Sequence, residues 1–257
     1  KPLIFTNNDS GYETAIEFKK NGVNPLILDT RKEPSSDIIT EAKNLGIDIK
    51  FSYVVVAAKG YKKVKSADIA KISENKKDLS NIENIECDCI CVSGFWTPSI
   101  HLASQSGNKS EFNEKIDAFI PKKSKQKENT IGSANGKFTL EETINEAFDK
   151  GYEVSNKITE NNNKVSIPTV VEKKSTEHDK FWCVPLPKGK SYKRFLDFQN
   201  DVAVTDIELA LREGFRSIEH VKRYTTLGMA TDQGKTSNLN GLQLVSDIEN
   251  KVVPQVG

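Results

Sequence analysis

The residues best suited to chemistry lie in a polar turn near the start of the chain. The turn at residues 6–11 reads Thr-Asn-Asn-Asp-Ser-Gly and follows an apolar run at residues 3–6. In a dinucleotide-binding turn, glycines let backbone amides approach a pyrophosphate at a helix N-terminus. Here only Gly11 fits that pattern, and the carboxylate of Asp9 would repel a phosphate. Two interpretations stay open: a nucleotide site with an altered turn, or a unit that keeps the fold and has lost its ligand.

A second polar position follows the next apolar run. Residues 25–28 read Pro-Leu-Ile-Leu and end at Asp29. An acidic residue at the end of the second strand of a dinucleotide unit accepts hydrogen bonds from a ribose hydroxyl. We therefore predict Asp29 as a cofactor-binding residue.

Three of the four cysteines are closely spaced. Cys87, Cys89 and Cys91 alternate along a strand pattern, which predicts that their thiols point to one face. A zinc or iron site needs more ligands, and the remaining cysteine and the three histidines are scattered along the chain. We predict small core residues and no metal, and a reducing, cytoplasmic location rather than a secreted disulfide framework.

A compact polar set follows in the last quarter of the chain. Its cations and hydroxyls surround two glycine turns and suit a phosphate, although a solvated charged face is an equal alternative. The set includes Lys222, Arg223, Thr225, Thr226 and Lys235. The helix, glycine turn and helix around it would also suit a DNA-binding motif, but the neutral charge balance argues against nucleic acid.

These residues need elements to position them. The apolar pattern predicts strands at 3–6, 25–28 and 47–50, with a helix on Tyr12, Ala15 and Ile16 that ends at Gly22 and another at 36–45. Short connections of this kind imply parallel strands. A β-ribbon follows at residues 53–57, with a turn at 59–60 and a return through residue 69.

The later elements are predicted more sparsely. A strand at residues 87–92 runs into a glycine turn, and residues 121–129 form a polar loop. Capping boxes predict helix starts at Thr139 with Glu142 and at Thr205 with Glu208. Two more helices are expected, at 218–224 and 238–248.

The predicted fold class is α/β. A three-layer, Rossmann-like dinucleotide-binding region covers residues 1–154, a polar linker covers 155–180, and a small, mostly α-helical domain covers 181–257. The 257 residues carry 37 Lys and Arg against 36 Asp and Glu, and no long apolar run predicts a membrane span. The first and last residues look like mid-domain sequence, which suggests a fragment.

Several segments carry a family resemblance. Residues 198–202, 212–217, 219–226 and 228–238 resemble the alpha subunits of heterotetrameric sarcosine oxidases, as do residues 6–10, 92–98 and 101–107. The resemblance covers nearly the whole chain and is weakest across 121–129 and 155–180. It implies the middle part of such a subunit, namely a pyridine-nucleotide-disulfide-reductase-like region that holds NAD and a small helical domain.

The resemblance also implies cofactor contacts. The turns at 94–98 and 132–136 resemble late turns at which backbone amides meet the dinucleotide, so the expected NAD residues are Gly94, Phe95, Trp96, Pro98, Gly132, Ser133 and Asn135. In the family, a beta subunit carries FAD and a covalent FMN that lies at the alpha and beta interface. The residues expected to line this FMN are Lys222, Arg223, Thr225, Thr226, Lys235, Thr236 and Ser237.

The small helical domain also resembles ferredoxin-like domains that bind an iron-sulfur cluster through four cysteines. Aligned with that pattern, the cysteine positions fall at Asp197, Gln199, Asp232 and Ser237. None of these side chains offers a thiolate, so we predict no cluster.

The implied reaction is the oxidation of sarcosine, or a similar N-methyl amine, to glycine. Oxygen becomes hydrogen peroxide, and the one-carbon unit passes to tetrahydrofolate, which a C-terminal region outside this chain would bind. No residue here is proposed as catalytic, and the expected partners are the beta subunit and the smaller subunits. The alternatives are the equivalent subunit of an N-methylglutamate or dimethylglycine dehydrogenase, and a non-catalytic assembly module with decayed nucleotide sites.

Overall fold

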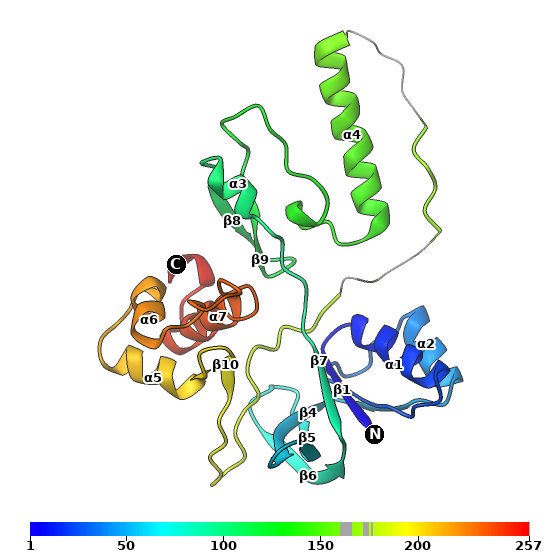
Figure 1. Cartoon of the computed structure of the whole chain (residues 1–257), viewed down its shortest axis with the longest axis vertical. Helices are drawn as coiled ribbons and strands as arrows, with labels where there is room; N and C mark the ends of the chain where they lie inside the picture. The colour runs from blue at the N-terminus through cyan, green and yellow to red at the C-terminus, as the bar shows by residue number, and fades with distance from the viewer. Residues whose placement is uncertain (160–165, 172–174, 176, 257) are drawn as a thin grey trace. The chain divides into compact units, whose positions relative to one another are not determined.

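The structure is a computed structural model that describes residues 1–159, 166–171, 175 and 177–256 (Figure 1). It contains two compact units. The first unit comprises Lys1–Gly94 and the chain from Asp179 onward, and the second comprises Phe95–His178. The second unit is therefore inserted into the chain of the first.

A four-stranded parallel sheet forms the centre of the first unit. Its strands are β1 (Pro2–Thr6), β2 (Leu26–Asp29), β3 (Asp48–Phe51) and β7 (Cys89–Ser93), in the order β3-β2-β1-β7. Helices α1 (Ser10–Lys20) and α2 (Asp37–Asn44) connect the first three strands. The predicted parallel strand, helix and strand unit is confirmed.

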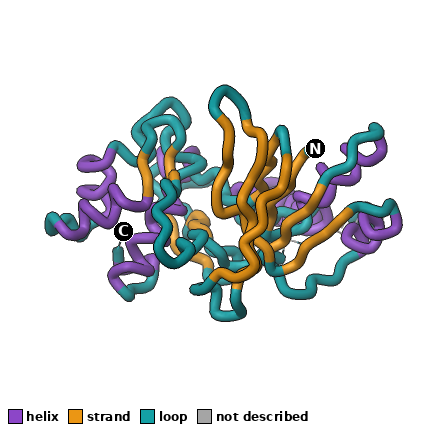
Figure 2. The backbone as a smooth tube through the Cα atoms, turned by 90° about the horizontal axis from the view of Figure 1, so that it is seen from below, coloured by secondary structure: helices purple, strands orange, loops and turns teal. Residues whose placement is uncertain are grey.

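A second, antiparallel sheet packs against the first. Its strands β4 (Tyr53–Gly60), β5 (Val64–Ile72) and β6 (Leu79–Glu86) form a meander that can be followed in Figure 2. The ribbon of β4 and β5 was predicted, but β6 was not, because the polar residues of its sequence Leu-Ser-Asn-Ile-Glu-Asn-Ile-Glu hide the alternation.

The two central strands of the parallel sheet, β1 and β2, are buried on both faces. Ile4 and Ile27 pack with Tyr12 and Ile39 on the helix side, whereas Leu3 packs on the meander side with the residues of a second core: Leu26, Leu28, Ala67, Ile69 and Cys87. Successive residues of a strand point to opposite faces, so the side chains of a continuous apolar run pack into both cores. This arrangement gives the three layers expected of the α/β class.

The remaining part of the first unit is mostly helical. After the hairpin of β10 (Phe195–Asp197) and β11 (Val202–Ala203) come α5 (Val204–Arg212), α6 (Ile218–Thr225), α7 (Asn238–Glu249) and the 3₁₀ helix η2 (Val253–Gln255). The three α-helices were predicted, but the capping box at Thr205 and Glu208 is wrong. The N-cap is Ala203, two residues earlier, and Asp206 Oδ2 accepts the Ala203 N–H at 2.8 Å.

The second unit is smaller. It contains α3 (His101–Gln105), the hairpin of β8 (Ser110–Asn113) and β9 (Ala118–Pro121), the 3₁₀ helix η1 (Gly132–Asn135) and α4 (Leu140–Thr159). The capping box at the start of α4 is confirmed, because Thr139 Oγ1 accepts the Glu142 N–H at 3.2 Å and the Glu142 carboxylate accepts the Thr139 N–H at 3.3 Å.

The compact units do not coincide with the domains expected from composition. Helix α4 continues to Thr159, which lies inside the predicted linker 155–180, and the chain rejoins the first unit at Asp179. The division into 1–154, 155–180 and 181–257 stays a prediction. Among the described helices, none combines the length and apolar character needed to cross a membrane.

Candidate functional site at the carboxyl edge of the parallel sheet

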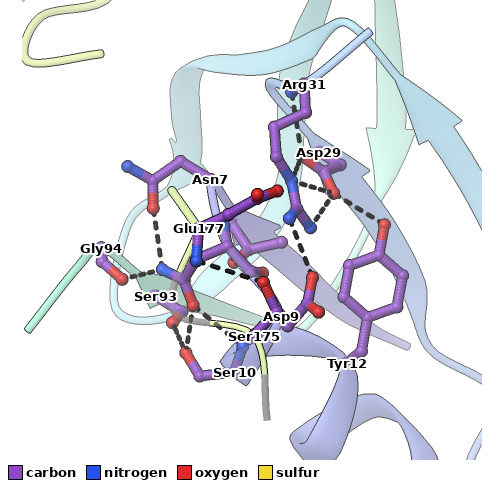
Figure 3. Close-up of polar contacts among 12 residues, drawn as sticks. Asn7, Asp9, Ser10, Tyr12, Asp29, Arg31, Ser93, Gly94, Ser175 and Glu177 are labelled. Carbon is purple, nitrogen blue, oxygen red and sulfur yellow. Dashed lines mark hydrogen bonds and ion pairs between the residues drawn. The ribbon is translucent and has the colours of Figure 1, made fainter. Parts of the chain in front are cut away.

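Three strand ends meet at one edge of the parallel sheet. Thr6 at the end of β1 is in register with Asp29 of β2 on one side and with Ser93 of β7 on the other. The chain order reverses around β1, and ligands of open α/β sheets bind at such a switch point, beyond the carboxyl ends of the strands. Figure 3 shows the side chains that gather there.

Asn7 and Asn8 fasten two distant chain segments to this edge. The Asn7 carbonyl accepts the Asp179 N–H at 2.8 Å, and Asn7 Nδ2 donates to the Asp179 carbonyl at 2.9 Å. Asn8 Nδ2 donates to the carbonyl of Gly94 (Figure 3). Gly94 and Asp179 are the residues at which the chain leaves the first unit and returns to it. The polar turn therefore holds the insertion point of the second unit.

The same turn accepts hydrogen bonds from the first residue of α1. Asn8 Oδ1 accepts the Ser10 N–H at 2.8 Å and the Ser10 hydroxyl at 2.6 Å, and the Ser10 and Ser93 hydroxyls share a hydrogen bond. A Cβ on Gly11 would lie 2.7 Å from the Cβ of Thr6. The glycine of this turn is thus required for close packing of helix on strand.

A buried ion-pair network lies beside the turn (Figure 3). Asp29 is fully buried and accepts a hydrogen bond from the Tyr12 hydroxyl at 2.7 Å and one from Arg31 Nη2 at 2.8 Å. The other end of the guanidinium, Nη1, lies 2.8 Å from Asp9 Oδ1. Arg31 therefore bridges the turn after β1 and the end of β2.

The charges of this network perturb its titrating groups. Burial, reinforced by the negative charge of Asp29, raises the pKa of Tyr12 far above its ordinary value. Burial alone would lower the pKa of Arg31, but its hydrogen bonds and ion pairs with Asp29 and Asp9 raise it. The phenol therefore stays protonated and the guanidinium stays charged at neutral pH.

These residues do not fit a bound dinucleotide. Both carboxylate oxygens of Asp29 accept hydrogen bonds from Tyr12 and Arg31, and the residue is fully buried, so no oxygen is exposed to a ribose hydroxyl. Asp9 lies where a pyrophosphate would approach α1, and Asn8 already accepts from the first turn of that helix. The geometry favours the interpretation in which this unit keeps the fold and has lost its ligand, and Asp29 is not carried into the proposed site.

The two later turns differ from each other in what they offer. A Cβ on Gly94 would meet nothing within 4 Å, and the side chain of Trp96 is 65 % exposed. Phe95 stacks on the ring of His178 at 4.9 Å. This first turn presents an open backbone and an exposed ring.

The second turn is occupied by a side chain of its own unit. The Gly132 N–H and Asn135 Nδ2 both donate to the Glu146 carboxylate, each at 2.7 Å. Sequence reasoning missed Glu146, because nothing in its spacing from the turn indicates that it folds back from α4. The converging donors show an anion-binding geometry that the chain fills itself, so only the predicted turn at 94–98 is left open.

The clustered cysteines do not share one face. Cys87 precedes β7 and packs on the meander side, whereas Cys91 packs on the helix side. The expectation of three core cysteines is also wrong, because Cys89 is exposed. Cys89 Sγ and Cys91 Sγ lie 3.8 Å apart on the same face of the strand. In the described part of the chain, no group of three or more His, Cys, Asp or Glu residues could hold a metal ion.

Comparisons with known proteins identify the relatives of the chain. Residues 191–257 match the family described as the sarcosine oxidase A3 domain. The sarcosine oxidase subunit alpha of Rhizobium meliloti (strain 1021) is 31% identical over 258 residues, covering 100% of this chain and 25% of the relative. This chain is a relative of sarcosine oxidase alpha subunits over its whole length.

Further matches agree with that relationship. The sarcosine oxidase subunit alpha of Corynebacterium sp. (strain U-96) is 27% identical over 96% of this chain and 26% of its own length. The chain thus spans about a quarter of the curated relatives it matches. L-proline dehydrogenase from P. horikoshii shares the fold, with a TM-score of 0.52 and 18% identity over 99% of this chain and 50% of the dehydrogenase.

The A3-domain region contains the predicted phosphate set. Lys222 and Arg223 lie in the last turn of α6, and neither they nor Lys235 has an ion-pair partner in the described part of the chain. Arg223 and Lys235 are exposed. Three cations of the sarcosine oxidase relative are therefore available to an anion.

The hydroxyls of that set are mostly engaged. Thr225 Oγ1 donates to the Val221 carbonyl at 2.8 Å and Thr236 Oγ1 donates to Asp232 Oδ2 at 2.8 Å, while Thr226 ends α6 with a positive φ of 62°. The hydrogen bond from Thr236, followed by the Gly234 N–H, lowers the pKa of Asp232 and keeps its negative charge in the loop. The hydroxyls therefore contribute less to an anion site than the three cations.

Ser237 was expected to line the FMN, but its side chain is buried. It is 1% exposed, and no hydrogen-bond partner of its hydroxyl is present within the described residues.

Asp197 joins two segments of the helical region, a role that the sequence did not predict. Its buried carboxylate accepts the N–H groups of Gln199 at 2.9 Å and Gly228 at 2.8 Å, and so joins the β10–β11 hairpin to the loop after α6.

Proposed function

We propose that this chain is part of the alpha subunit of a sarcosine oxidase. The observation that carries this proposal is the similarity to the Rhizobium meliloti subunit across 100% of the chain at 31% identity. The proposed reaction oxidises sarcosine to glycine, reduces oxygen to hydrogen peroxide and transfers the one-carbon unit to tetrahydrofolate. None of the residues described here is assigned to the chemical step, so the role of the chain is to bind cofactors and support the assembly.

The cationic group is the proposed contact with FMN. A bound flavin would supply the capacity to accept and pass on electrons, and its phosphate would be paired by charge with the side chains of the chain. Lys222, Arg223 and Lys235 have the charge and availability for that contact. Thr225, Thr226 and Thr236 stay in the proposal as neighbours of that site, whereas the burial of Ser237 argues against its direct contact.

The proposed NAD contact is the turn at residues 94–98. The open side of Gly94 and the exposed ring of Trp96 support this placement, with Phe95 and Pro98 in the same segment. Gly132, Ser133 and Asn135 are weaker candidates, because Glu146 engages two of the three residues. NAD at residues 94–98 is compatible with the turn after β1, whose polar side chains already contact one another and Arg31.

The proposed assembly includes a beta subunit that carries FAD and shares FMN at the interface, together with smaller subunits. Tetrahydrofolate would bind to another part of the whole alpha subunit. The cytoplasm is the proposed compartment, since four free cysteines suit a reducing environment.

The test is to purify the chain with its flavoprotein partner, denature the complex and identify the released molecules by mass spectrometry. We expect NAD to be released from this chain. In the variant with K222E, R223E and K235E, we expect about tenfold weaker association with the partner that carries the covalent FMN, with K62E as a matched control at an exposed lysine. Equally tight association of both variants with that partner would contradict the FMN contact.

Two other functions make different predictions. The self-satisfied turn at Asn7 and Asn8 favours an assembly module without nucleotide, which predicts a complex that forms and releases no NAD. A related dehydrogenase subunit would share this fold, and it predicts amine oxidation without hydrogen peroxide. Measuring peroxide and released nucleotide in one preparation separates these functions.

A further inference from the structure

The exposed edge of the parallel sheet carries a pair of thiols. Strand β7 is the last strand in the order β3-β2-β1-β7, so in the described sheet it has a neighbour on one side only. Cys89 and Cys91 are two positions apart on this strand, and their sulfur atoms lie 3.8 Å apart. This distance is van der Waals contact between two free thiols.

We propose that Cys89 and Cys91 form a reversible redox pair that peroxides oxidise to a disulfide. The Cys89 thiol transfers two electrons to the peroxide, which gives a sulfenic acid on Cys89 and water from hydrogen peroxide. The Cys91 sulfur then attacks the Cys89 sulfur, the S–S bond forms, and the sulfenic oxygen leaves as a second water. A dithiol reductant reverses the reaction by thiol–disulfide exchange.

Exposure sets the order of these two steps. Cys89 is exposed, so the peroxide reaches its sulfur first. Burial, followed by the contact with the Cys89 thiol, raises the pKa of Cys91, which disfavours the thiolate form that would react with peroxide at this position. Cys89 is therefore the peroxidatic position and Cys91 the resolving position.

The other two cysteines have different surroundings. Cys87 is buried in the meander-side core, on the opposite side of the sheet from the packing of Cys91. Cys183 accepts a hydrogen bond from Arg194 Nη1 at 3.2 Å, in the segment that leads to β10. These two cysteines provide matched controls.

Disulfide formation requires the sulfur atoms to close from 3.8 Å to about 2 Å. An edge strand with one hydrogen-bonded neighbour can accommodate the small backbone adjustment this needs. The proposed oxidase reaction would generate hydrogen peroxide, but the inference does not rest on that function. The experiment supplies the peroxide from outside.

The experiment treats the full chain with a small excess of hydrogen peroxide and measures free thiols and intact mass. We expect the four thiols to fall to two with a mass loss of about 2 Da, and dithiothreitol to restore all four. In C91S, we expect no disulfide and a sulfenic acid on Cys89 that dimedone traps. In C89S, the thiols should survive the same dose.

The controls keep the result interpretable. C87A and C183S should retain the peroxide-dependent loss of two thiols, with wild-type circular dichroism confirming their fold. The proposal is overturned if wild type keeps four thiols, or if C91S still forms an internal disulfide. A failure of the amine oxidase assay would leave this result untouched, since the thiol measurement requires neither amine nor flavin.

Discussion

At the scale of single residues, Arg31 is the side chain on which the carboxyl edge of the sheet depends. It is the shared cation of two buried carboxylates, Asp29 at 2.8 Å and Asp9 at 2.8 Å. A buried carboxylate that loses its cation keeps its desolvation cost without compensation. Replacing Arg31 alone should therefore destabilise the folded state, because the two carboxylates would stay buried without their cation.

We predict that Arg31→Met lowers the free energy of unfolding by about 3 kcal/mol, because two carboxylates are left buried without a cation. Urea unfolding monitored by circular dichroism measures the change. Lys32→Met is the matched control, since the Lys32 side chain is 71% exposed in its ion pair with Glu74 and should leave the midpoint unchanged. Equal effects of the two substitutions would contradict the buried network.

The protonated phenol of Tyr12 predicts a dependence on alkaline pH. The pKa of Tyr12 is higher in the folded state than the ordinary value of about 10, so above that pH the unfolded chain loses this proton first. Stability should be constant below pH 10 with respect to this group and fall as the pH rises beyond it. In Tyr12→Phe the alkaline loss should be smaller, while Tyr61→Phe, at a side chain that is 95% exposed, should behave as wild type.

At the scale of elements, glycines show how packing and helix propensity compete. Gly11 lies in α1 where a Cβ would approach the Thr6 side chain to 2.7 Å, whereas Gly151 lies in α4 with nothing within 4 Å of a Cβ. A glycine in a helix costs stability relative to alanine unless the extra carbon has no space.

We therefore predict opposite signs for the same substitution. Gly11→Ala should destabilise the first unit by about 2 kcal/mol through overpacking, and Gly151→Ala should stabilise α4 by about 0.5–1 kcal/mol. Hydrogen exchange of the amides of each helix separates the two effects. Loss of protection in α4 on Gly151→Ala would show that the space beside this glycine is not free.

The elements also show how far the sequence can predict this structure. Apolar runs such as residues 25–28 predicted the parallel strands, since burial on both faces leaves a continuous apolar segment. The capping box at Thr139 was equally local and is confirmed. Strand β6 was missed because its residues are at most half-buried and mostly polar, and because its pairing with β5 joins residues that are distant in the sequence.

The candidate site was less predictable for the same reason. The polar turn after the first strand left open whether a nucleotide site was altered or lost, and the partners that Asn7 and Asn8 have in the structure, Asp179 and Gly94, are far away in the sequence. Asp29 was placed correctly at the end of a strand, whereas its burial beneath Arg31 depends on how two turns meet. Local patterns predict the position of a side chain better than they predict what it contacts.

At the scale of the molecule, the second unit is inserted between Gly94 and Asp179 of the first. We predict that replacing residues 95–178 by a short Gly-Ser linker leaves the first unit folded, because Asn7 and Asn8 hold the two ends of the replaced segment close together. Cooperative thermal unfolding and wild-type protection of β1 are the expected results. Replacing residues 53–86 instead should prevent folding, since the meander covers Leu3 and Leu28.

The position of β7 in the sheet determines the order in which a growing chain can fold. Strands β1, β2 and β3 pair with their neighbours in sequence, so their pairing partners are all present once residues 1–51 have been synthesised. The other side of β1 stays open until the meander and then β7 have been synthesised, and Asp179 reaches Asn7 later still. The parallel sheet can therefore be completed, and its insertion point closed, only after the chain has been synthesised as far as Asp179.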